Sequence, residues 1–323
     1  MGSCHRGFGM SRQVERVPWL SGVVTPVCTP LTDELEVDAG SLERLVAFHL
    51  EAGVEGIFVL GSSGEVAFLR DDQRDLVVEV VTKTVAGQVP VLAGAIDMTT
   101  PRSVDQAERA IRKGADAIVV TAPFYARVTH PGEIEQHFRT IKAATGVRVI
   151  AYDIPAAVHT KLDPTLLTEL AYAGIIDGVK DSSGDLHALR QLVMGASSIS
   201  ELSIFTGSEV VVDAALLIGV DGAVPGLANV DPHAYVRLHT TARASDWTGA
   251  RTQQERLVRL FALTACADPA RRGQSSSVIG AFKTALMLRG VIATNAVALP
   301  QARLEEDEVA RVMTVLDEAG LVP

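Results

Sequence analysis

Hydrophobic residues along this chain follow two spacings that alternate with each other. Short apolar runs, typical of strands buried on both faces, are followed by longer segments with apolar residues at i, i+3, i+4 and i+7, typical of amphipathic helices. A glycine often stands between the end of a helix and the next apolar run, at positions 53, 114, 146, 174 and 219. Because glycine can adopt the left-handed conformation that ends a helix, the pattern predicts repeated strand–helix units joined by short turns.

The pattern predicts eight such units. The strands are expected at residues 22–27, 56–60, 89–94, 117–121, 147–152, 176–180, 202–206 and 222–224, and the helices at 42–49, 71–85, 104–111, 131–144, 164–171, 185–195, 209–218 and 232–244. Eight units with uniformly apolar strands indicate an α/β protein, a (β/α)8 TIM barrel, more than an open doubly wound sheet. No Gly-x-Gly-x-x-Gly follows the first strand, which disfavours a Rossmann dinucleotide site.

The remaining segments lie on either side of the barrel pattern. Residues 1–20 are rich in Gly, Ser and Arg, lack periodicity and are expected to be a flexible extension; a vector origin for part of it is open. The barrel is expected to occupy residues 21–244. A C-terminal helical region, 245–323, holds three more helical patterns, at 246–263, 278–288 and 304–318. This region could cap the barrel, form a subunit interface or simply pack on the barrel wall.

Composition narrows the possible partners. The chain is 47% hydrophobic but only 5% aromatic, so its core must be aliphatic, and its formal net charge of −10 argues against a nucleic-acid or anionic-membrane partner. Cys4, Cys28 and Cys266 lie far apart and in no Cys/His cluster, which indicates neither a zinc site nor a disulfide framework. This cysteine pattern favours a reducing cytoplasm, and the lack of an apolar run of roughly 20 residues indicates that the chain is not inserted in a membrane.

Lys180 ends the sixth predicted strand, and its position allows two interpretations. It could be an ordinary strand-end lysine that pairs with Asp177 or Asp181. Alternatively, burial could hold its amine neutral, and a neutral amine can attack a ketone to form a Schiff base. In a barrel the carboxyl ends of the strands converge on one face, where catalytic groups lie, so the residues after the other strands bear on this choice.

Two other strand ends carry candidate chemistry. The second strand is followed by Gly-Ser-Ser-Gly-Glu at 61–65, which is either an ordinary turn or a cradle of N–H groups and hydroxyls for a carboxylate. Tyr152 closes the fifth strand, three residues before Pro155. Its phenol could be a core side chain with one satisfied hydroxyl, or it could shuttle protons beside a reactive lysine.

These motifs, in this order, resemble the N-acetylneuraminate lyase / dihydrodipicolinate synthase family of pyruvate-dependent class I aldolases. The matching motifs are Gly-Ser-Ser-Gly-Glu at 61–65, Tyr-Asp-Ile-Pro at 152–155 and Gly-Val-Lys at 178–180, and the resemblance extends over about residues 22–316. It implies a barrel with a C-terminal helical region, a homotetramer built from tight dimers, and no metal or organic cofactor.

The resemblance also implies a role for individual residues. Lys180 would be the Schiff-base lysine, Tyr152 the proton-shuttling tyrosine and Ser62 the hydroxyl of the proton relay. Tyr125 would reach across a dimer interface into the neighbouring site. The implied substrate-binding positions, at which pyruvate would meet a hydroxyl or the backbone, are Ser63, Gly61, Gly64, Gly207 and Val224.

The chain departs from the family pattern at the second substrate. Dihydrodipicolinate synthases carry a carboxylate-binding arginine at the position of Ala157, and only His159 or Lys161 could replace it. Residues 152–162 are closer to the sialic acid lyase branch. Val210 and the Pro-Gly at 225–226, however, replace residues that a sialic acid substrate would need. Asp153, where the family commonly has Asn, has no role that the sequence reveals.

The resulting hypothesis is a lyase that cleaves a 2-oxo acid to pyruvate and an aldehyde, or condenses the two. Three alternatives stay open. Two are enzymes of the same family, a 4-hydroxy-tetrahydrodipicolinate synthase and a sugar-acid dehydratase. The third is a pyruvate-binding sensor without turnover.

Overall fold

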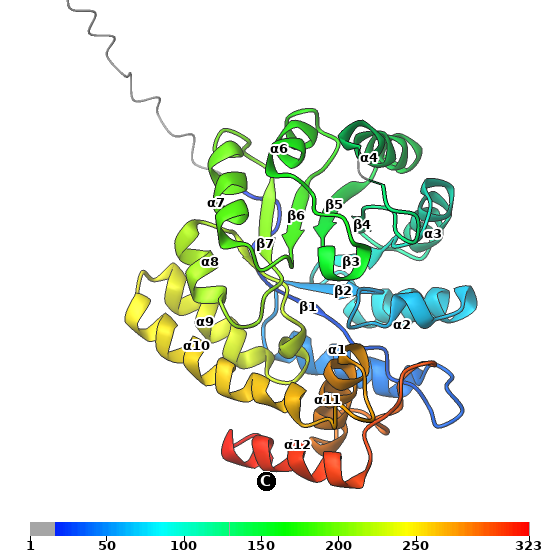
Figure 1. Cartoon of the computed structure of the whole chain (residues 1–323), viewed down its shortest axis with the longest axis vertical. Helices are drawn as coiled ribbons and strands as arrows, with labels where there is room; N and C mark the ends of the chain where they lie inside the picture. Colours follow the sequence, from blue (N-terminus) through cyan, green and yellow to red (C-terminus); the bar gives the residue numbers. More distant parts are fainter. Residues whose placement is uncertain (1–16, 129, 323) are drawn as a thin grey trace, which may run out of the picture.

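The computed structural model describes residues 17–128 and 130–322, and its centre is a closed barrel of eight parallel strands (Figure 1). Each strand pairs with its neighbours in chain order, and β8 closes the barrel against β1. The strands are β1 (Gly22–Pro26), β2 (Gly56–Val59), β3 (Val91–Gly94), β4 (Ala117–Thr121), β5 (Arg148–Asp153), β6 (Gly178–Asp181), β7 (Ser203–Thr206) and β8 (Gly222–Ala223). The predicted (β/α)8 barrel is therefore confirmed.

Helices surround the strands. In chain order they are α1 (Ala39–Glu51), η1 (Val66–Phe68), α2 (Asp71–Val85), α3 (Thr100–Arg112), α4 (Pro131–Thr145), α5 (Pro155–Val158), α6 (Pro164–Tyr172), α7 (Leu186–Gly195), α8 (Val212–Ile218), η2 (Gly226–Asn229) and α9 (Pro232–Arg243). The short helix α5, directly after β5, was not predicted. No helix in the described part of the chain is long and apolar enough to cross a membrane.

Local signals explain where many of these helices begin. Four of them, and α10 (Trp247–Phe261) after them, are preceded by an aspartate whose carboxylate accepts a backbone N–H of the first turn, a common N-cap. These aspartates are Asp38, Asp163, Asp185, Asp231 and Asp246. Proline occupies the first turn of α3, α4, α5, α6 and α9, where its missing N–H costs no hydrogen bond.

The predicted start of α8 was wrong by three residues. The sequence pattern placed it at Glu209, whereas the helix begins at Val212. The carbonyl oxygen of Glu209 instead accepts hydrogen bonds from Tyr235 Oη at 3.2 Å and Gln254 Nε2 at 2.9 Å. Tertiary hydrogen bonds thus hold residues 209–211 as a loop after β7.

Four carboxylates hold the amino end of the barrel together. Each stands directly before an even-numbered strand and accepts the N–H of a residue in the preceding odd-numbered strand. The pairs are Glu55 with Val23 at 2.7 Å, Asp116 with Val91 at 2.8 Å, Asp177 with Val149 at 2.9 Å and Asp221 with Ile204 at 2.7 Å. Asp177 also contacts Lys142 Nζ at 2.8 Å, so the suggested pairing of Asp177 with Lys180 is wrong.

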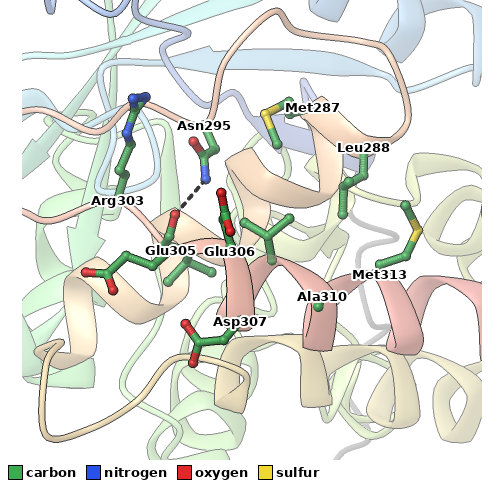
Figure 2. A pocket seen from close by; sticks show the side chains of 11 residues that line it. Met287, Leu288, Asn295, Arg303, Glu305, Glu306, Asp307, Ala310 and Met313 are labelled. Carbon is green, nitrogen blue, oxygen red and sulfur yellow. Dashed lines mark hydrogen bonds between the residues drawn. The ribbon is translucent and has the colours of Figure 1, made fainter.

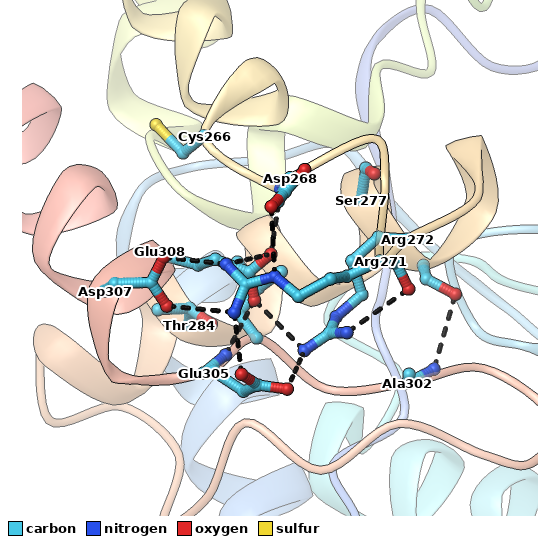
Figure 3. A network of polar contacts seen from close by, with 12 residues as sticks. Cys266, Asp268, Arg271, Arg272, Ser277, Thr284, Ala302, Glu305, Asp307 and Glu308 are labelled. Carbon is cyan, nitrogen blue, oxygen red and sulfur yellow. Dashed lines mark hydrogen bonds and ion pairs between the residues drawn. The ribbon is translucent and has the colours of Figure 1, made fainter.

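The remaining helices are α10 (Trp247–Phe261), η3 (Ala262–Ala265), α11 (Gln274–Leu288) and α12 (Glu306–Glu318). In Figure 1, α11 and α12 lie beside α1 and α10, at the end of the molecule away from α4 and α6. Helix α11 begins one turn before its predicted start at residue 278. An ion-pair network, shown in Figure 3, joins the segment before α11 to the start of α12. Within it, Arg272 contacts Glu305 at 2.9 Å and the fully buried Glu308 at 3.1 Å.

Candidate active site

Lys180 and Tyr152 are register partners on the adjacent strands β6 and β5. The side-chain nitrogen of Lys180 lies 4.1 Å from the centre of the Tyr152 ring and 5.0 Å from the centre of the Phe58 ring. Lys180 and Tyr152 are both buried, and Lys180 is only 5% exposed. Asp181, the other suggested partner of Lys180, lies 3.8 Å from Lys161. Among the described residues, no carboxylate forms an ion pair with Lys180, so the interpretation as an ordinary paired lysine loses its support.

The loop 61–65 turns tightly after β2 and brings its backbone to the mouth of the barrel, the opening at the carboxyl ends of the strands. A Cβ added at Gly64 would lie 3.1 Å from two backbone atoms, and one added at Gly61 would lie 2.7 Å from a phenyl ring. A side chain at Gly64 would therefore press on backbone, and one at Gly61 would displace the Phe58 ring. Ser62 is exposed and Ser63 is half-buried. The loop thus presents two hydroxyls at the same end of the barrel as Lys180.

Glu65 ends this loop and is anchored from the C-terminal region. Its side chain is fully buried and forms an ion pair with Lys283 on α11. Its Oε1 accepts the N–H of Ala298 at 2.7 Å, while Lys283 donates to the carbonyl oxygen of Ala296 at 2.8 Å. The left-handed backbone of Glu65, with φ 59°, is uncommon for a residue other than glycine. Helix α11 is therefore part of the structure that shapes the loop.

Glu209, Ser63 and Phe282 converge on Gly226 from different elements. A Cβ at Gly226 would lie 2.8 Å from the Phe282 ring, 3.1 Å from Glu209 Oε1 and 3.2 Å from Ser63 Oγ. Glu209 Oε1 also accepts the Gly226 N–H at 3.0 Å. Burial raises the pKa of Glu209, although its backbone hydrogen bonds and the charge of Lys180 oppose the shift. The geometry gives Glu209 a place in the mouth, next to the loop hydroxyls.

Gly207 and Val224 lie at the ends of β7 and β8. A Cβ at Gly207 would overlap Ser182 Oγ and lie 2.9 Å from Lys180 Cε, so only glycine leaves the lysine side chain its space. The Val224 N–H donates to Thr206 O at 2.7 Å, which continues the β7–β8 pairing by one residue. These two predicted positions thus border the side of the mouth on which Lys180 lies.

Tyr125 is the predicted site residue that the structure does not pack into the mouth. It lies on the loop after β4, has a left-handed φ of 76° and is 94% exposed within this chain. A left-handed tyrosine is uncommon and costs free energy. An exposed aromatic ring held in this way is available to a neighbouring molecule.

Asp153 forms an ion pair with Lys161, so Lys161 is not a free cation. The Asp153 side chain is fully buried, forms an ion pair with Lys161, and accepts the N–H of Leu162 at 3.0 Å. Burial raises the pKa of Asp153, and the Lys161 ammonium opposes that shift. Asp153 therefore fixes the segment after β5. Of the two residues that could replace an arginine at position 157, Lys161 is therefore already paired.

A cavity of about 200 Å³ opens over the ends of β2, β3, β4 and β5. Eight of the side chains that line it are apolar: Val66, Ala67, Phe68, Ile96, Phe124, Ile154, Ala157 and Val158. The polar ones are Ser62, Glu65, Thr121 and Ser275. Thr121 is the register partner of Tyr152, which in turn pairs with Lys180. The cavity thus continues the mouth past Tyr152, away from the lysine.

A larger open depression, of about 990 Å³, lies elsewhere (Figure 2). It is lined by residues of α11 and α12 and of the segment between them, among them Met287, Asn295 and Met313. None of its lining residues follows a barrel strand, so it is separate from the candidate active site. Within the described residues, no group of three or more His, Cys, Asp or Glu side chains could hold a metal ion.

Comparison with known proteins identifies the family. A model of the dihydrodipicolinate synthetase family matches residues 19–319. This chain belongs to that family. A DapA-like lyase of Halobacterium salinarum, itself uncharacterized, is 34% identical over 94% of this chain and 95% of its own length. A 4-hydroxy-tetrahydrodipicolinate synthase of Laribacter hongkongensis is 31% identical over 94% of this chain and its full length.

A solved structure of the same family has the same architecture. The prophage protein YagE of E. coli K12, described as a member of the dihydrodipicolinic acid synthase family in complex with pyruvate, superposes with a TM-score of 0.86. It is 26% identical, and the match covers 93% of this chain and 99% of that chain. The family resemblance inferred from the strand-end motifs is confirmed.

The sequence did not indicate several of the residues that lie at the mouth. Phe58 and Thr121 looked like ordinary strand residues, and their inward direction depends on barrel register. Lys283 and Phe282 lie in a helix more than 200 residues after the loop they contact, and nothing in their own helical pattern indicates that contact.

Proposed function

We propose that this protein is a class I aldolase that joins pyruvate to an aldehyde, or cleaves the resulting 2-oxo acid, through a Schiff base on Lys180. The observation that carries the proposal is a buried lysine that forms no ion pair with the described carboxylates and lies side by side with Tyr152 on adjacent barrel strands. Membership of the dihydrodipicolinate synthetase family supports it, as does the pyruvate complex of YagE.

The chemistry follows from these positions. Lys180 Nζ attacks the carbonyl carbon of pyruvate, and loss of water gives an imine that draws electrons from the neighbouring methyl group. A methyl proton leaves to give an enamine, whose carbon attacks the aldehyde. Tyr152, linked through Ser62 and a neighbouring subunit's copy of Tyr125, transfers protons to and from the reacting oxygens. Ser63 and the backbone of loop 61–65, Gly207 and Val224 hold the pyruvate.

A trapping experiment tests the proposal. The protein is incubated with pyruvate, reduced with borohydride and weighed, and the modified peptide is sequenced. We expect one reduced pyruvate per chain, attached to Lys180, and no adduct in Lys180→Ala. An unmodified protein, or an adduct that persists in Lys180→Ala, would overturn the assignment and leave a protein without Schiff-base chemistry.

The family offers two other activities, which product analysis separates. 4-Hydroxy-tetrahydrodipicolinate synthase activity is favoured by the name of the Laribacter relative and opposed by Ala157, where a carboxylate-binding arginine was expected. A sugar-acid dehydratase would release water without forming pyruvate. A pyruvate-binding sensor would form the adduct and turn over no aldehyde.

The exposed Tyr125 supports assembly into a homotetramer of tight dimers, in which this ring would enter the neighbouring site. Sedimentation of the purified chain tests the assembly, and a monomer with full activity would rule out a shared site. A cytoplasmic location fits the acidic composition and the absence of cysteine clusters in the sequence. Fractionation of the source cells checks that location.

A further inference from the structure

The cavity at Thr121 lies two strands from Lys180, on the Tyr152 side of the mouth. Thr121 on β4 is the register partner of Tyr152 on β5, and Tyr152 is the register partner of Lys180 on β6, so a molecule bonded to Lys180 reaches the cavity by passing Tyr152. Thr121 lines the cavity and is 3% exposed. Its hydroxyl oxygen is buried and has no hydrogen-bond partner among the described atoms.

The lining of the cavity is mostly apolar, which favours an apolar ligand. Two phenyl rings, Phe68 and Phe124, and three branched side chains, Ile96, Ile154 and Val158, form most of its wall. Such a wall stabilises an apolar group by removing it from water and offers no compensation to a polyol or an ionised group. A dry apolar cavity of roughly 150 Å³ is large enough to bind benzene, so the 200 Å³ found here admits one ring or a short branched chain.

Three charged groups near the cavity are already paired, and Arg127 lines a separate pocket with His159 and Lys161. Glu65 lines the cavity but forms a buried ion pair with Lys283. Lys161 is held by Asp153, and Arg74 lies within 3.7 Å of two aspartates while donating to a backbone carbonyl at 2.8 Å. No side chain that lines the described cavity carries a positive charge. An aldehyde with a carboxylate or phosphate would therefore be desolvated without a counter-ion.

We infer that the second substrate is a small apolar aldehyde, with a branched aliphatic chain or a single aromatic ring that fills the cavity over the ends of β2, β3, β4 and β5. The inference rests on the proposed aldolase function. In the condensation, the enamine carbon on Lys180 forms a bond to the aldehyde carbon, the carbonyl electron pair moves to the aldehyde oxygen, and that oxygen takes a proton delivered by Tyr152. Water then hydrolyses the iminium, which frees Lys180 and a 4-hydroxy-2-oxo acid.

The test compares aldehydes of similar size and different polarity. Initial rates are measured with pyruvate and isovaleraldehyde, benzaldehyde, succinic semialdehyde or glyceraldehyde. We expect kcat/KM for the first two to exceed that for the last two by about tenfold or more, because a buried ion or hydroxyl without a partner is rejected more strongly than a missing methylene group.

Two neighbouring alanines on α5 supply the variant and its control. Ala157 lines the cavity and Ala156 does not, although both are exposed. Ala157→Arg should shift the preference by about tenfold towards succinic semialdehyde by adding a guanidinium for the carboxylate. Ala156→Arg should leave the preference of the wild type.

The outcomes separate this inference from the function on which it rests. Borohydride trapping of pyruvate is carried out first on every variant. If the adduct forms but succinic semialdehyde or glyceraldehyde reacts as well as the apolar aldehydes, or no aldehyde of the panel reacts, this inference is overturned and the pyruvate chemistry stands. If no adduct forms, both are overturned.

Discussion

Two buried lysines, Lys283 and Lys180, have different surroundings. Lys283 is fully buried, forms an ion pair with Glu65 and donates to a backbone carbonyl. Lys180 faces the rings of Tyr152 and Phe58 and forms no ion pair with the described carboxylates. The Lys283 nitrogen is thus occupied by two acceptors, whereas the Lys180 nitrogen has no carboxylate on it among the described residues. This difference in contacts is what the proposed Schiff base on Lys180 requires.

The hydroxyl of Tyr152 should matter for turnover more than for folding. Tyr152→Phe keeps the ring over Lys180 but removes the group that moves protons, so we expect kcat to fall by about 10²- to 10⁴-fold. Steady-state rates with pyruvate and an aldehyde measure this, and urea unfolding should give nearly the wild-type stability. Tyr172→Phe, which removes a hydroxyl from an exposed tyrosine on α6, serves as the control. An unchanged kcat in Tyr152→Phe would remove Tyr152 from the mechanism.

At the scale of elements, the barrel repeats one carboxylate–backbone contact four times, and the sequence alone does not reveal it. The carboxylates before β2, β4, β6 and β8 each bind the N–H of a residue in the preceding strand. In the sequence they appear only as an acidic residue before a small one. Asp177 looked like a partner for Lys180 because the two are close in the chain. Three residues along a strand span about 10 Å, which places them at different levels of the barrel.

Helix α4 is fastened to the barrel by a buried histidine. His137 Nε2 lies 3.1 Å from the carbonyl oxygen of Thr121, and its Nδ1 lies 2.9 Å from Thr100 Oγ1 at the start of α3. A neutral ring that donates from Nε2 and accepts at Nδ1 satisfies both contacts. Burial lowers the pKa of His137 to about 4, although the hydrogen bond to Thr121 opposes the shift.

This histidine should make stability depend on pH below neutrality. Between the unfolded pKa near 6.5 and the folded value of about 4, the unfolded chain binds a proton that the folded chain does not. The contribution of His137 to the free energy of unfolding should therefore be constant above pH 6.5 and fall as pH decreases towards 4, by about 1.4 kcal/mol per pH unit. Urea unfolding from pH 7.5 to 4.5 measures the slope.

The matched variants identify the residue responsible. His137→Gln keeps a donor and an acceptor without the titration, so its slope should be shallower than that of the wild type. His187→Gln, at an exposed position on α7, should keep the wild-type slope. Buried His49, whose pKa burial lowers to about 3, contributes to the slope of every variant. Parallel profiles for wild type and His137→Gln would contradict the prediction.

For the whole molecule, the sequence predicted the parts that depend on local pattern. Apolar periodicity and helix-ending glycines gave all eight strands, and the motifs at 61–65, 152–155 and 178–180 gave the family. The sequence could not predict that Lys283 would reach Glu65, because a contact between residues 218 positions apart leaves no local signal. It also missed the apolar cavity, since its wall is collected from separate loops that only barrel closure brings together.

The C-terminal region contains two buried ion pairs with different neighbours. Glu65–Lys283 joins α11 to the loop at the mouth. Arg272–Glu308 joins the segment before α11 to α12, within the network of Figure 3, and Glu308 is fully buried. Removing one partner of a buried pair leaves a desolvated charge in either place. The consequences for activity should differ, because only the first pair touches a loop that is proposed to hold pyruvate.

Lys283→Met should lower the free energy of unfolding by about 3–5 kcal/mol and also slow the trapping of pyruvate by borohydride. The uncompensated Glu65 carboxylate must move or take up a proton, and loop 61–65 moves with it. Arg272→Met should reduce stability in the same direction while leaving the trapping rate at the wild-type value. Urea unfolding and timed borohydride reduction, both at a temperature where each variant is folded, measure the two effects. Equal trapping rates in the two variants would mean that the mouth does not depend on the Glu65–Lys283 pair. In Lys283→Met/Glu65→Gln, the neutral amide removes the unpaired charge, so stability should recover in part.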